Sequence, residues 1–320
     1  MEPLVDRMNP NGAGDTEPTP VHPDPREVTM RRLLDHFAIS SGTIIGREHV
    51  RCHKNNQDGL AVSATDDLLV AAVTDGCSSG RYSEVGARLG ASWLAQWVPI
   101  FVQRHQSIRS AEFLQAVGDG FLAYLGSLGR RLQPDKAGLP ASVQDFLLFT
   151  FQVAVMTPAE TCLFGLGDGV IGLNDTWITL DAGPDNAPPY LAYRLVEQSL
   201  TGPVGSLVPV IHAYRPTATV ERLLIGTDGA TEIETSAGDR LGNGEPIGSL
   251  PDLAADPRYA RNPSLLQKRL IVLGELNRTL HDDTTLVLIQ RKGLPESRLG
   301  DPAALSVFPK LPEELSSSAS

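Results

Sequence analysis

The stretch from Phe146 to Asn174 constrains the fold more than any other part of the chain. It holds three short runs rich in β-branched and aromatic residues, which are typical of strands: Phe146–Met156, Thr161–Phe164 and Gly169–Asn174. Only a few residues separate these runs, whereas a parallel connection needs a crossover of a dozen or more. The sequence therefore predicts an antiparallel meander, and it does not show the strict alternation of a doubly wound parallel fold.

Further strands and helices are predicted on both sides of this stretch. The other strand-like runs are Leu68–Val73, Tyr190–Val196, Leu207–Tyr214, Val220–Thr227 and Thr284–Ile289. Apolar residues at steps of three or four predict helices over Ser83–His105, behind a Ser110 N-cap, and from Asn262 to Leu276. Pro99 is expected to kink or end the first of them. Two adjacent helices, a meander, a late helix and a last strand indicate an α+β fold with antiparallel sheets.

The composition excludes several function classes. The chain carries 38 acidic and 27 basic residues, and its net charge of −11 argues against a nucleic-acid backbone as the main partner. No apolar run approaches the roughly 20 residues of a membrane helix. The N-terminus is acidic and proline-rich rather than signal-peptide-like, so we expect a cytoplasmic protein. The three cysteines show no CxxC spacing, which excludes a cysteine-rich zinc site.

We expect one folded domain over residues 30–291, a size that a single domain readily reaches. Residues 1–29 are acidic and rich in proline, and they are predicted to form a disordered leader. Residues 292–320 end in a serine-rich segment and are predicted to form a flexible tail.

Acidic residues recur where predicted strands end or begin. They are, in chain order, Asp58, Asp75, Asp168, Asp228 and the pair Asp282 and Asp283. Carboxylates at the ends of neighbouring strands can converge on one point. Such a cluster of hard oxygen ligands suits Mg²⁺ or Mn²⁺, whose charge would relieve the repulsion between them.

Any one of these Asp-Gly pairs could merely turn a hairpin. The sequence contains its own control, because Val117-Gly-Asp119-Gly is almost identical to Leu166-Gly-Asp168-Gly yet lies in a helical stripe where no strand ends. We assign no function to Asp119. The prediction of a metal site depends on the order and the strand context of the whole set.

These motifs resemble those of the type 2C metal-dependent (PPM) serine/threonine protein phosphatases, in a bacterial-like variant. The family's motifs are Asn-Glu-Asp, Asp-Gly before a small-residue turn, a Gly-Asp-Ser hairpin, a late strand end Leu-Leu-Ala-Ser-Asp-Gly, and a terminal Asp-Asn-x-Thr. Their counterparts here are Asn56–Asp58, Asp75–Gly76, Gly167–Gly169, Leu224–Gly229 and Asp282–Thr285. All five occur in the family's order, and the resemblance covers about residues 42–291.

The resemblance implies a four-layer α-β-β-α sandwich of two antiparallel sheets flanked by helices. It also implies two Mn²⁺ or Mg²⁺ ions and a further, weaker one. Asp75 would bridge two ions, the Gly76 carbonyl would bind one of them, and Asp228 and Asp282 would bind the other. Asp58 would lie next to the centre as a ligand or just outside it, and Asp168 would hold the further ion together with Asp228.

The resemblance also implies a reaction and a partner. A metal-activated water would attack the phosphorus of phosphoserine or phosphothreonine in line, and Asp58, Asp75, Asp228 and Asp282 would be the catalytic carboxylates. The implied partner is a phosphorylated protein, the target of a serine/threonine kinase, with no role for nucleic acid or a membrane.

The chain departs from the family's pattern at three places. Gln57 replaces a glutamate and is a weaker ligand, and Asp283 replaces an asparagine. Alignment favours Asp282 over Asp283 as the ligand but leaves the choice open. His53 stands where the family commonly has a phosphate-binding arginine, so Arg51 and His53 are the candidates for that contact. On a strand edge, these two residues and His49 would lie on one face.

Two other functions stay open from the sequence. The first is a catalytically weak or inactive phosphatase-like module that regulates or binds a partner. Gln57 and the missing arginine favour it, whereas the intact Asp75, Asp228 and Asp282 do not. The second is an unrelated phosphoesterase that acts on small molecules.

Overall fold

A computed structural model describes residues 32–132, 138–183, 188–196 and 207–293. The predicted leader over residues 1–29 lies outside the described residues. The predicted tail lies outside them too, except for its first two residues, of which Lys292 bonds to His36 through its backbone amide. The domain limits drawn from the sequence therefore stay predictions.

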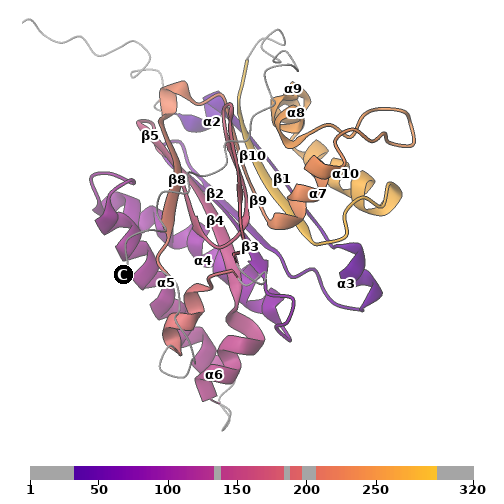
Figure 1. Cartoon of the computed structure of the whole chain (residues 1–320). Helices are drawn as coiled ribbons and strands as arrows, with labels where there is room; N and C mark the ends of the chain where they lie inside the picture. Colours follow the sequence, from indigo (N-terminus) through magenta and orange to yellow (C-terminus); the bar gives the residue numbers. More distant parts are fainter. Residues whose placement is uncertain (1–31, 133–137, 184–187, 197–206, 294–320) are drawn as a thin grey trace, which may run out of the picture.

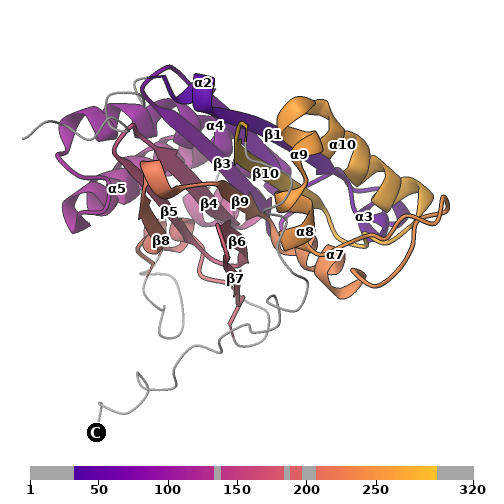
Figure 2. The same ribbon diagram turned by 90° about the horizontal axis from the view of Figure 1, so that it is seen from above.

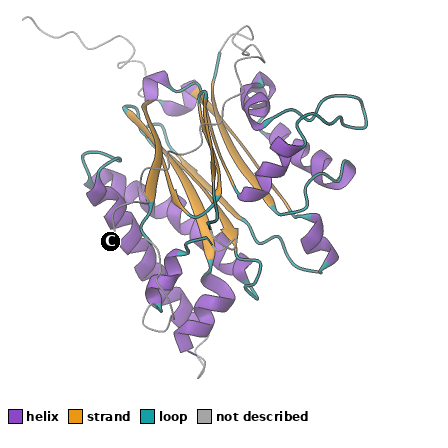
Figure 3. Ribbon diagram, viewed as in Figure 1, coloured by secondary structure: helices purple, strands orange, loops and turns teal. Residues whose placement is uncertain are grey.

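Two five-stranded sheets, both antiparallel throughout, form the centre of the molecule (Figures 1 and 3). The strands of the first sheet, in spatial order, are β1 (Phe37–Ile44), β10 (Thr284–Arg291), β9 (Arg222–Gly226), β6 (Gly169–Leu173) and β7 (Thr176–Leu180). Those of the second are β2 (Gly59–Ala64), β3 (Leu69–Gly76), β4 (Phe149–Met156), β5 (Glu160–Leu166) and β8 (Val210–Pro216).

Helices cover the outer face of each sheet, which makes the predicted four-layer α-β-β-α sandwich (Figure 2). On the second sheet lie α4 (Ser83–Arg104) and α5 (Ala111–Leu132). On the first lie α8 (Leu250–Ala255), α9 (Pro257–Arg261) and α10 (Ser264–Ile271), which continues as a π-helical turn over Val272–Leu276. No helix in the described ranges is long and apolar enough to cross a membrane.

Shorter helices connect these layers. They are α2 (Leu33–His36), α3 (Arg47–Arg51), α6 (Gly138–Ser142) with a π-helical turn over Val143–Leu147, α7 (Thr231–Thr235), and 3-10 turns at Leu191–Leu195, Thr217–Thr219 and Asp228–Ala230. The predicted Ser110 cap is confirmed, because its hydroxyl accepts the backbone N–H of Phe113 at 3.1 Å. The first helix does not end at Pro99, since α4 runs through that residue to Arg104.

The predicted meander is wrong in one connection. β4 and β5 pair as expected, but β6 pairs with β7 and β9 in the other sheet. Gly167 (φ 94°) and Gly169 (φ 134°) adopt backbone conformations that other residues rarely reach, and they turn the chain from one sheet to the other. This crossing sets Asp168 between the two sheets at one end of the sandwich.

Some local predictions also fail. Tyr190–Val196 forms a 3-10 turn rather than a strand, because Leu191 and Ala192 pack into the core beside α5. The strands β1, β2 and β7 were not predicted. The sequences of β1 and β2 contain glycine, serine and alanine among their apolar residues, so no strand signal stands out there. The short run of β7 has a strand-like composition that the sequence analysis passed over.

The core beneath α4 and α5 rests on a stack of aromatic rings around Phe121. This side chain is fully buried, and its ring lies 4.9 Å from that of Trp93 and 5.5 Å from that of Phe151. We expect Phe121→Ala to lower the free energy of unfolding by about 3–5 kcal/mol, because it leaves a cavity between helix and sheet. Urea denaturation measures this. Leu276→Ala is the control, because Leu276 is 76% exposed, and a similar loss there would contradict the packing described.

Candidate metal centre

The predicted acidic residues gather at one end of the sandwich. The strands β3 and β9 end there, and β10 begins there (Figure 1). Asp75 is the last residue but one of β3, Asp228 comes two residues after β9, and Asp282 two residues before β10. The turn after β5 brings Asp168, and the segment before β2 brings Asp58. The side chain of Asn56 holds that last segment, since its Oδ1 accepts the backbone N–H of Asp58 at 2.9 Å. The antiparallel order of the strands thus collects five carboxylates from distant parts of the chain.

Mutual repulsion shows how closely the carboxylates converge. Burial raises the pKa of Asp75 well above 3.8, and the charges of Asp58 and Asp228 raise it further. Burial also raises the pKa of Asp58, with Asp283 and then Asp228 as the repelling charges. Burial and then Asp228 raise the pKa of Asp168 to about 6.

Asp282 completes the group. Burial raises the pKa of this carboxyl, and Asp228 is again the largest repelling charge. Asp228 therefore acts on all four of its neighbours and lies at the centre of the cluster. Without a bound cation, the repulsion between these carboxylates disfavours the folded state.

Two carboxylate oxygens of the cluster have no partner in the described part of the chain. The Oδ1 atoms of Asp58 and Asp228 are buried and accept no hydrogen bond. The other oxygen of Asp58 accepts the hydroxyl of Thr227 at 3.0 Å, which fixes the orientation of the carboxylate. A buried carboxylate oxygen without a partner is costly unless a cation or a proton satisfies it. The residues present therefore fit a site for hard divalent cations.

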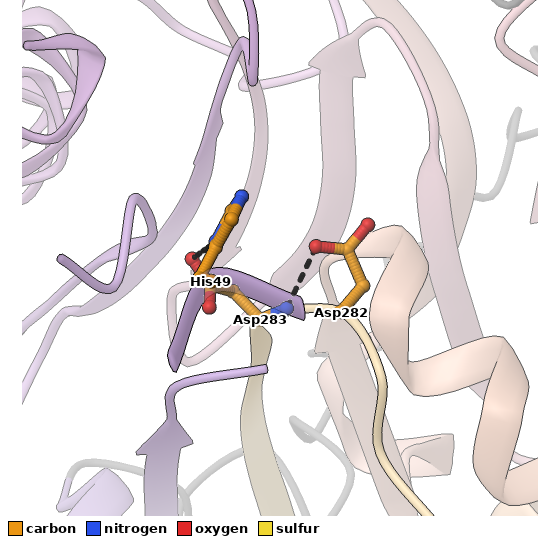
Figure 4. A group of neighbouring side chains, drawn as sticks. All are labelled: His49, Asp282 and Asp283. Atoms are coloured by element: carbon orange, nitrogen blue, oxygen red, sulfur yellow. Dashed lines mark hydrogen bonds and ion pairs between the residues drawn. The ribbon is translucent and has the colours of Figure 1, made fainter. Parts of the chain in front are cut away.

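The two adjacent aspartates before β10 have different surroundings (Figure 4). Asp283 is only 2% exposed, and its Oδ1 accepts the backbone N–H of Gly46 at 2.6 Å. Its Oδ2 accepts the backbone N–H of Gln57 at 2.5 Å and bonds to Nδ1 of His49 at 2.8 Å.

One oxygen of the Asp282 carboxylate accepts the backbone N–H of Asp283 at 2.8 Å (Figure 4). His49, Asp282 and Asp283 offer ligand atoms within 4.8 Å of one another. Protein donors already occupy both oxygens of Asp283, however. This geometry favours Asp282 over Asp283 as the residue that faces the cluster. Asp283 instead holds α3 and the Gln57 segment in place through its hydrogen bonds.

Glu232 is a site residue that the sequence analysis missed. Its Oε2 accepts the backbone N–H of His281 at 2.5 Å and that of Asp282 at 3.4 Å, and Oε1 lies 3.4 Å from the His281 ring. Glu232 thus ties the loop that carries Asp282 to α7, which follows Asp228. The sequence signal that could have identified Glu232 is its position one helical turn after Asp228.

We expect Glu232→Ala to weaken Mn²⁺ binding about tenfold, because it frees the backbone on which Asp282 is mounted. Calorimetric titration of Mn²⁺ measures the change. Glu234→Ala on the same helix is the control, since Glu234 bonds instead to the backbone N–H of Leu250 at 2.9 Å. Equal Mn²⁺ affinity in Glu232→Ala and the native protein would remove Glu232 from the site.

The predicted strand edge at Arg51 and His53 is wrong, whereas their contact with substrate phosphate stays a prediction. Residues 47–51 form α3, and His53 follows with φ 55°. On a helix, His49 and Arg51 cannot share the alternating face that a strand would give them. His49 turns inward to Asp283, whereas the exposed Arg51 donates to Glu48 at 2.8 Å.

Two further residues from the sequence analysis have plain structural roles. Gln57 is buried, and its amide nitrogen donates to the hydroxyl of Ser83 at the start of α4 at 2.8 Å. Asp119 lies in α5, where it accepts from Gln115 at 2.8 Å and pairs with Arg194 at 3.2 Å. The near-copy of the Gly-Asp-Gly motif therefore lies in a helix, away from the strand ends, as predicted.

A family profile described as protein phosphatase 2C matches residues 45–246, which is more than half of the chain. The chain belongs to the protein phosphatase 2C family. The resemblance seen in the motifs is thereby confirmed. The matched range includes Asp58, Asp75, Asp168 and Asp228, while Asp282 lies beyond its end.

Several solved phosphatase 2C structures resemble this one at low sequence identity. The serine/threonine phosphatase Stp1 from Staphylococcus aureus is 13% identical, with 80% of this chain and 95% of that chain covered and a TM-score of 0.45. The S. agalactiae serine/threonine phosphatase is 14% identical, with 79% and 99% covered and a TM-score of 0.46.

The catalytic domain of the serine threonine protein phosphatase PstP, solved in complex with two manganese ions, is 15% identical. The comparison covers 80% of this chain and 98% of that one, with a TM-score of 0.42. A search of curated protein sequences gave no significant match. Membership of the protein phosphatase 2C family rests on the match over residues 45–246 and on the motifs within it.

Proposed function

We propose that this phosphatase 2C family member is a Mn²⁺- or Mg²⁺-dependent phosphoserine/phosphothreonine protein phosphatase. One observation carries the proposal: Asp228 lies at the centre of a partly buried carboxylate cluster in which two buried oxygens have no partner among the described residues. Bound cations would neutralise these carboxylates and offset the repulsion between them. The order of its motifs along the chain supports the family's reaction.

The proposed roles follow from the position of each group. Asp75, the Gly76 carbonyl, Asp228 and Asp282 would hold two ions, and Asp58 would complete the centre through its free Oδ1. When bound, two such ions supply an activated water and neutralise charge on the phosphoryl oxygens. The chain's own contribution is orientation, which Thr227 gives to Asp58 and Glu232 gives to the Asp282 loop.

Asp168 is proposed to hold a further ion together with Asp228. Because its pKa lies at about 6, protons compete for this carboxylate at mildly acidic pH, and the ion it holds would be the weakest of the group. The proposed substrate is a phosphorylated protein, the target of a serine/threonine kinase.

A second candidate is a regulatory module of the same fold with little or no turnover. The observation that favours it is Gln57, whose amide bonds to Ser83 and replaces a carboxylate of the family's motif. Such a module would still bind Mn²⁺ through the remaining carboxylates.

The test is hydrolysis of a phosphothreonine peptide during a Mn²⁺ titration, with Asp228→Ala alongside. We expect metal-dependent release of phosphate by the native protein and none by the variant, with an unchanged circular dichroism spectrum. Sugar phosphates and nucleotides are assayed in parallel, and a clear preference for them would favour the small-molecule phosphoesterase. Saturable Mn²⁺ binding without turnover on any substrate would favour the regulatory module.

A further inference from the structure

Four basic side chains lie on α3, just after it and on α4, next to the segments that carry Asp58 and Asp75. They are Arg47, Arg51, Lys54 and Arg88, here called the basic rim. Lys54 and Arg88 are both exposed.

Two members of the basic rim contact the segments that carry candidate ligands. Nζ of Lys54 donates to the carbonyl of Ser78 at 2.6 Å, in the turn directly after Asp75 and Gly76. A guanidinium nitrogen of Arg88 donates to the carbonyl of Asn56 at 2.8 Å, two residues before Asp58. The rim is therefore held next to the place where the phosphoryl group of a substrate would be bound.

The charges of the basic rim are largely uncompensated. Arg51 pairs with Glu48 at 2.8 Å, but Lys54, Arg88 and Arg47 donate only to carbonyl oxygens. Within the described ranges none of these three lies within salt-bridge distance of a carboxylate. The nearby Glu84 accepts from the side chain of Asn55 at 2.9 Å. Three cations beside the site thus remain available to an external anion.

We propose that the basic rim binds acidic residues that flank the phosphorylated serine or threonine of the substrate protein. This inference rests on the proposed function and adds the class of sequence that the phosphatase prefers. Once cations neutralise the carboxylate cluster, the basic rim is the charged surface next to it, and flanking aspartate or glutamate side chains complement it. Charge complementarity of this kind increases the association rate and the specificity for the matching partner.

The binding experiment separates the rim from the metal chemistry. Unphosphorylated threonine peptides with glutamate, serine or lysine flanks are titrated into the protein with Mn²⁺ present and at low ionic strength, with fluorescence anisotropy as the readout. We expect the glutamate-flanked peptide to bind about tenfold more tightly than the serine-flanked one. Lys54→Glu/Arg88→Glu should abolish this preference, and about 0.5 M salt should weaken it in the native protein.

Arg104→Glu/Arg215→Glu is the matched control, because it changes the net charge equally at two exposed positions. Arg215 pairs with Thr161 near the start of β5, at the opposite end of that strand from Asp168. Arg104 lies about 24 Å further along α4 than Arg88. The control variant should keep the preference for glutamate flanks. Equal affinity of the native protein for all three peptides would overturn the proposal, and so would an equal loss of preference in the control variant.

Turnover then distinguishes this inference from the proposed function. With Mn²⁺ present, the rim variant should lower kcat/KM for the glutamate-flanked phosphopeptide about tenfold relative to that for the serine-flanked one, through a raised KM. A lowered kcat with unchanged KM would overturn the rim's role in binding. Preserved peptide preference in a protein that hydrolyses nothing would support the rim and overturn the phosphatase function. Preferred binding of a DNA or RNA oligonucleotide over the acidic peptide would instead favour a nucleic-acid partner.

Discussion

Replacing Asp75 by asparagine is expected to abolish hydrolysis and, at the same time, to stabilise the metal-free protein. Asp75 is buried and repelled by Asp58 and Asp228, so its charge disfavours the folded state when no cation is bound. Removing that charge should raise the free energy of unfolding by roughly 1–2 kcal/mol. The same carboxylate is proposed to bridge the ions. Its loss should therefore lower kcat on the order of a thousandfold, equivalent to about 4 kcal/mol in the activation barrier.

Urea denaturation in the presence of a chelator measures the stability, and phosphopeptide turnover with Mn²⁺ measures the activity. Asp119→Asn is the matched control, because Asp119 sits in an almost identical Gly-Asp-Gly sequence within α5 and pairs with Arg194 at the surface. We expect Asp119→Asn to change the stability by less than about 1 kcal/mol and the turnover not at all. An Asp75→Asn protein that is less stable than the native one without metal would contradict the repulsion inferred for the cluster.

The second large effect concerns pH in the absence of metal. Asp168 has a pKa of about 6 when folded against an ordinary value of 3.8, so the folded state holds its proton longer than the unfolded state. Below about pH 4 the Asp168 carboxyl is protonated in both states, so its raised pKa does not change the free energy of unfolding. The destabilisation grows as the pH rises to about 6 and is complete above it. Asp58 and Asp75 act in the same direction, since their pKa values are raised as well.

We therefore expect the metal-free native protein to lose stability between about pH 4 and pH 6, on the order of 3 kcal/mol from Asp168 alone. The Asp168→Asn variant should not show this part of the loss of stability. Comparing it with the native protein therefore separates Asp168 from the other titrating groups. Saturating Mn²⁺ should raise the melting temperature by several degrees at pH 7.5 and barely at pH 4.5, because protons and cations compete for the same oxygens. Equal Mn²⁺ stabilisation at both pH values would contradict the account.

The sequence predicts the carboxylate cluster well because its members occupy strand ends. Asp75 and Asp228 follow apolar runs whose strand character needs no tertiary information, and an antiparallel sandwich brings such ends together. The connection at Asp168 could not be predicted from local signals. Whether the strand after a tight glycine turn pairs with its predecessor or joins the opposite sheet depends on packing between layers.

Residues that act through backbone groups were not found from the sequence. Glu232 reveals its role only through the N–H groups of His281 and Asp282, which are distant in sequence. The sequence left Asp283 as an alternative ligand. Its three hydrogen-bond donors are His49 on α3, Gly46 just before α3, and Gln57, all distant from Asp283 in sequence. The helix at Arg47–Arg51 was mistaken for a strand edge because basic side chains recur there at every second residue, and a run of five residues is too short to distinguish a strand from a helix.

The most direct test of the metal centre is a crystal structure of the native protein in Mn²⁺, with anomalous scattering used to locate the ions. The account predicts two strong peaks bounded by the carboxylates of Asp75, Asp228 and Asp282. No peak there at saturating Mn²⁺, or a single peak between His49, Asp282 and Asp283, would contradict it.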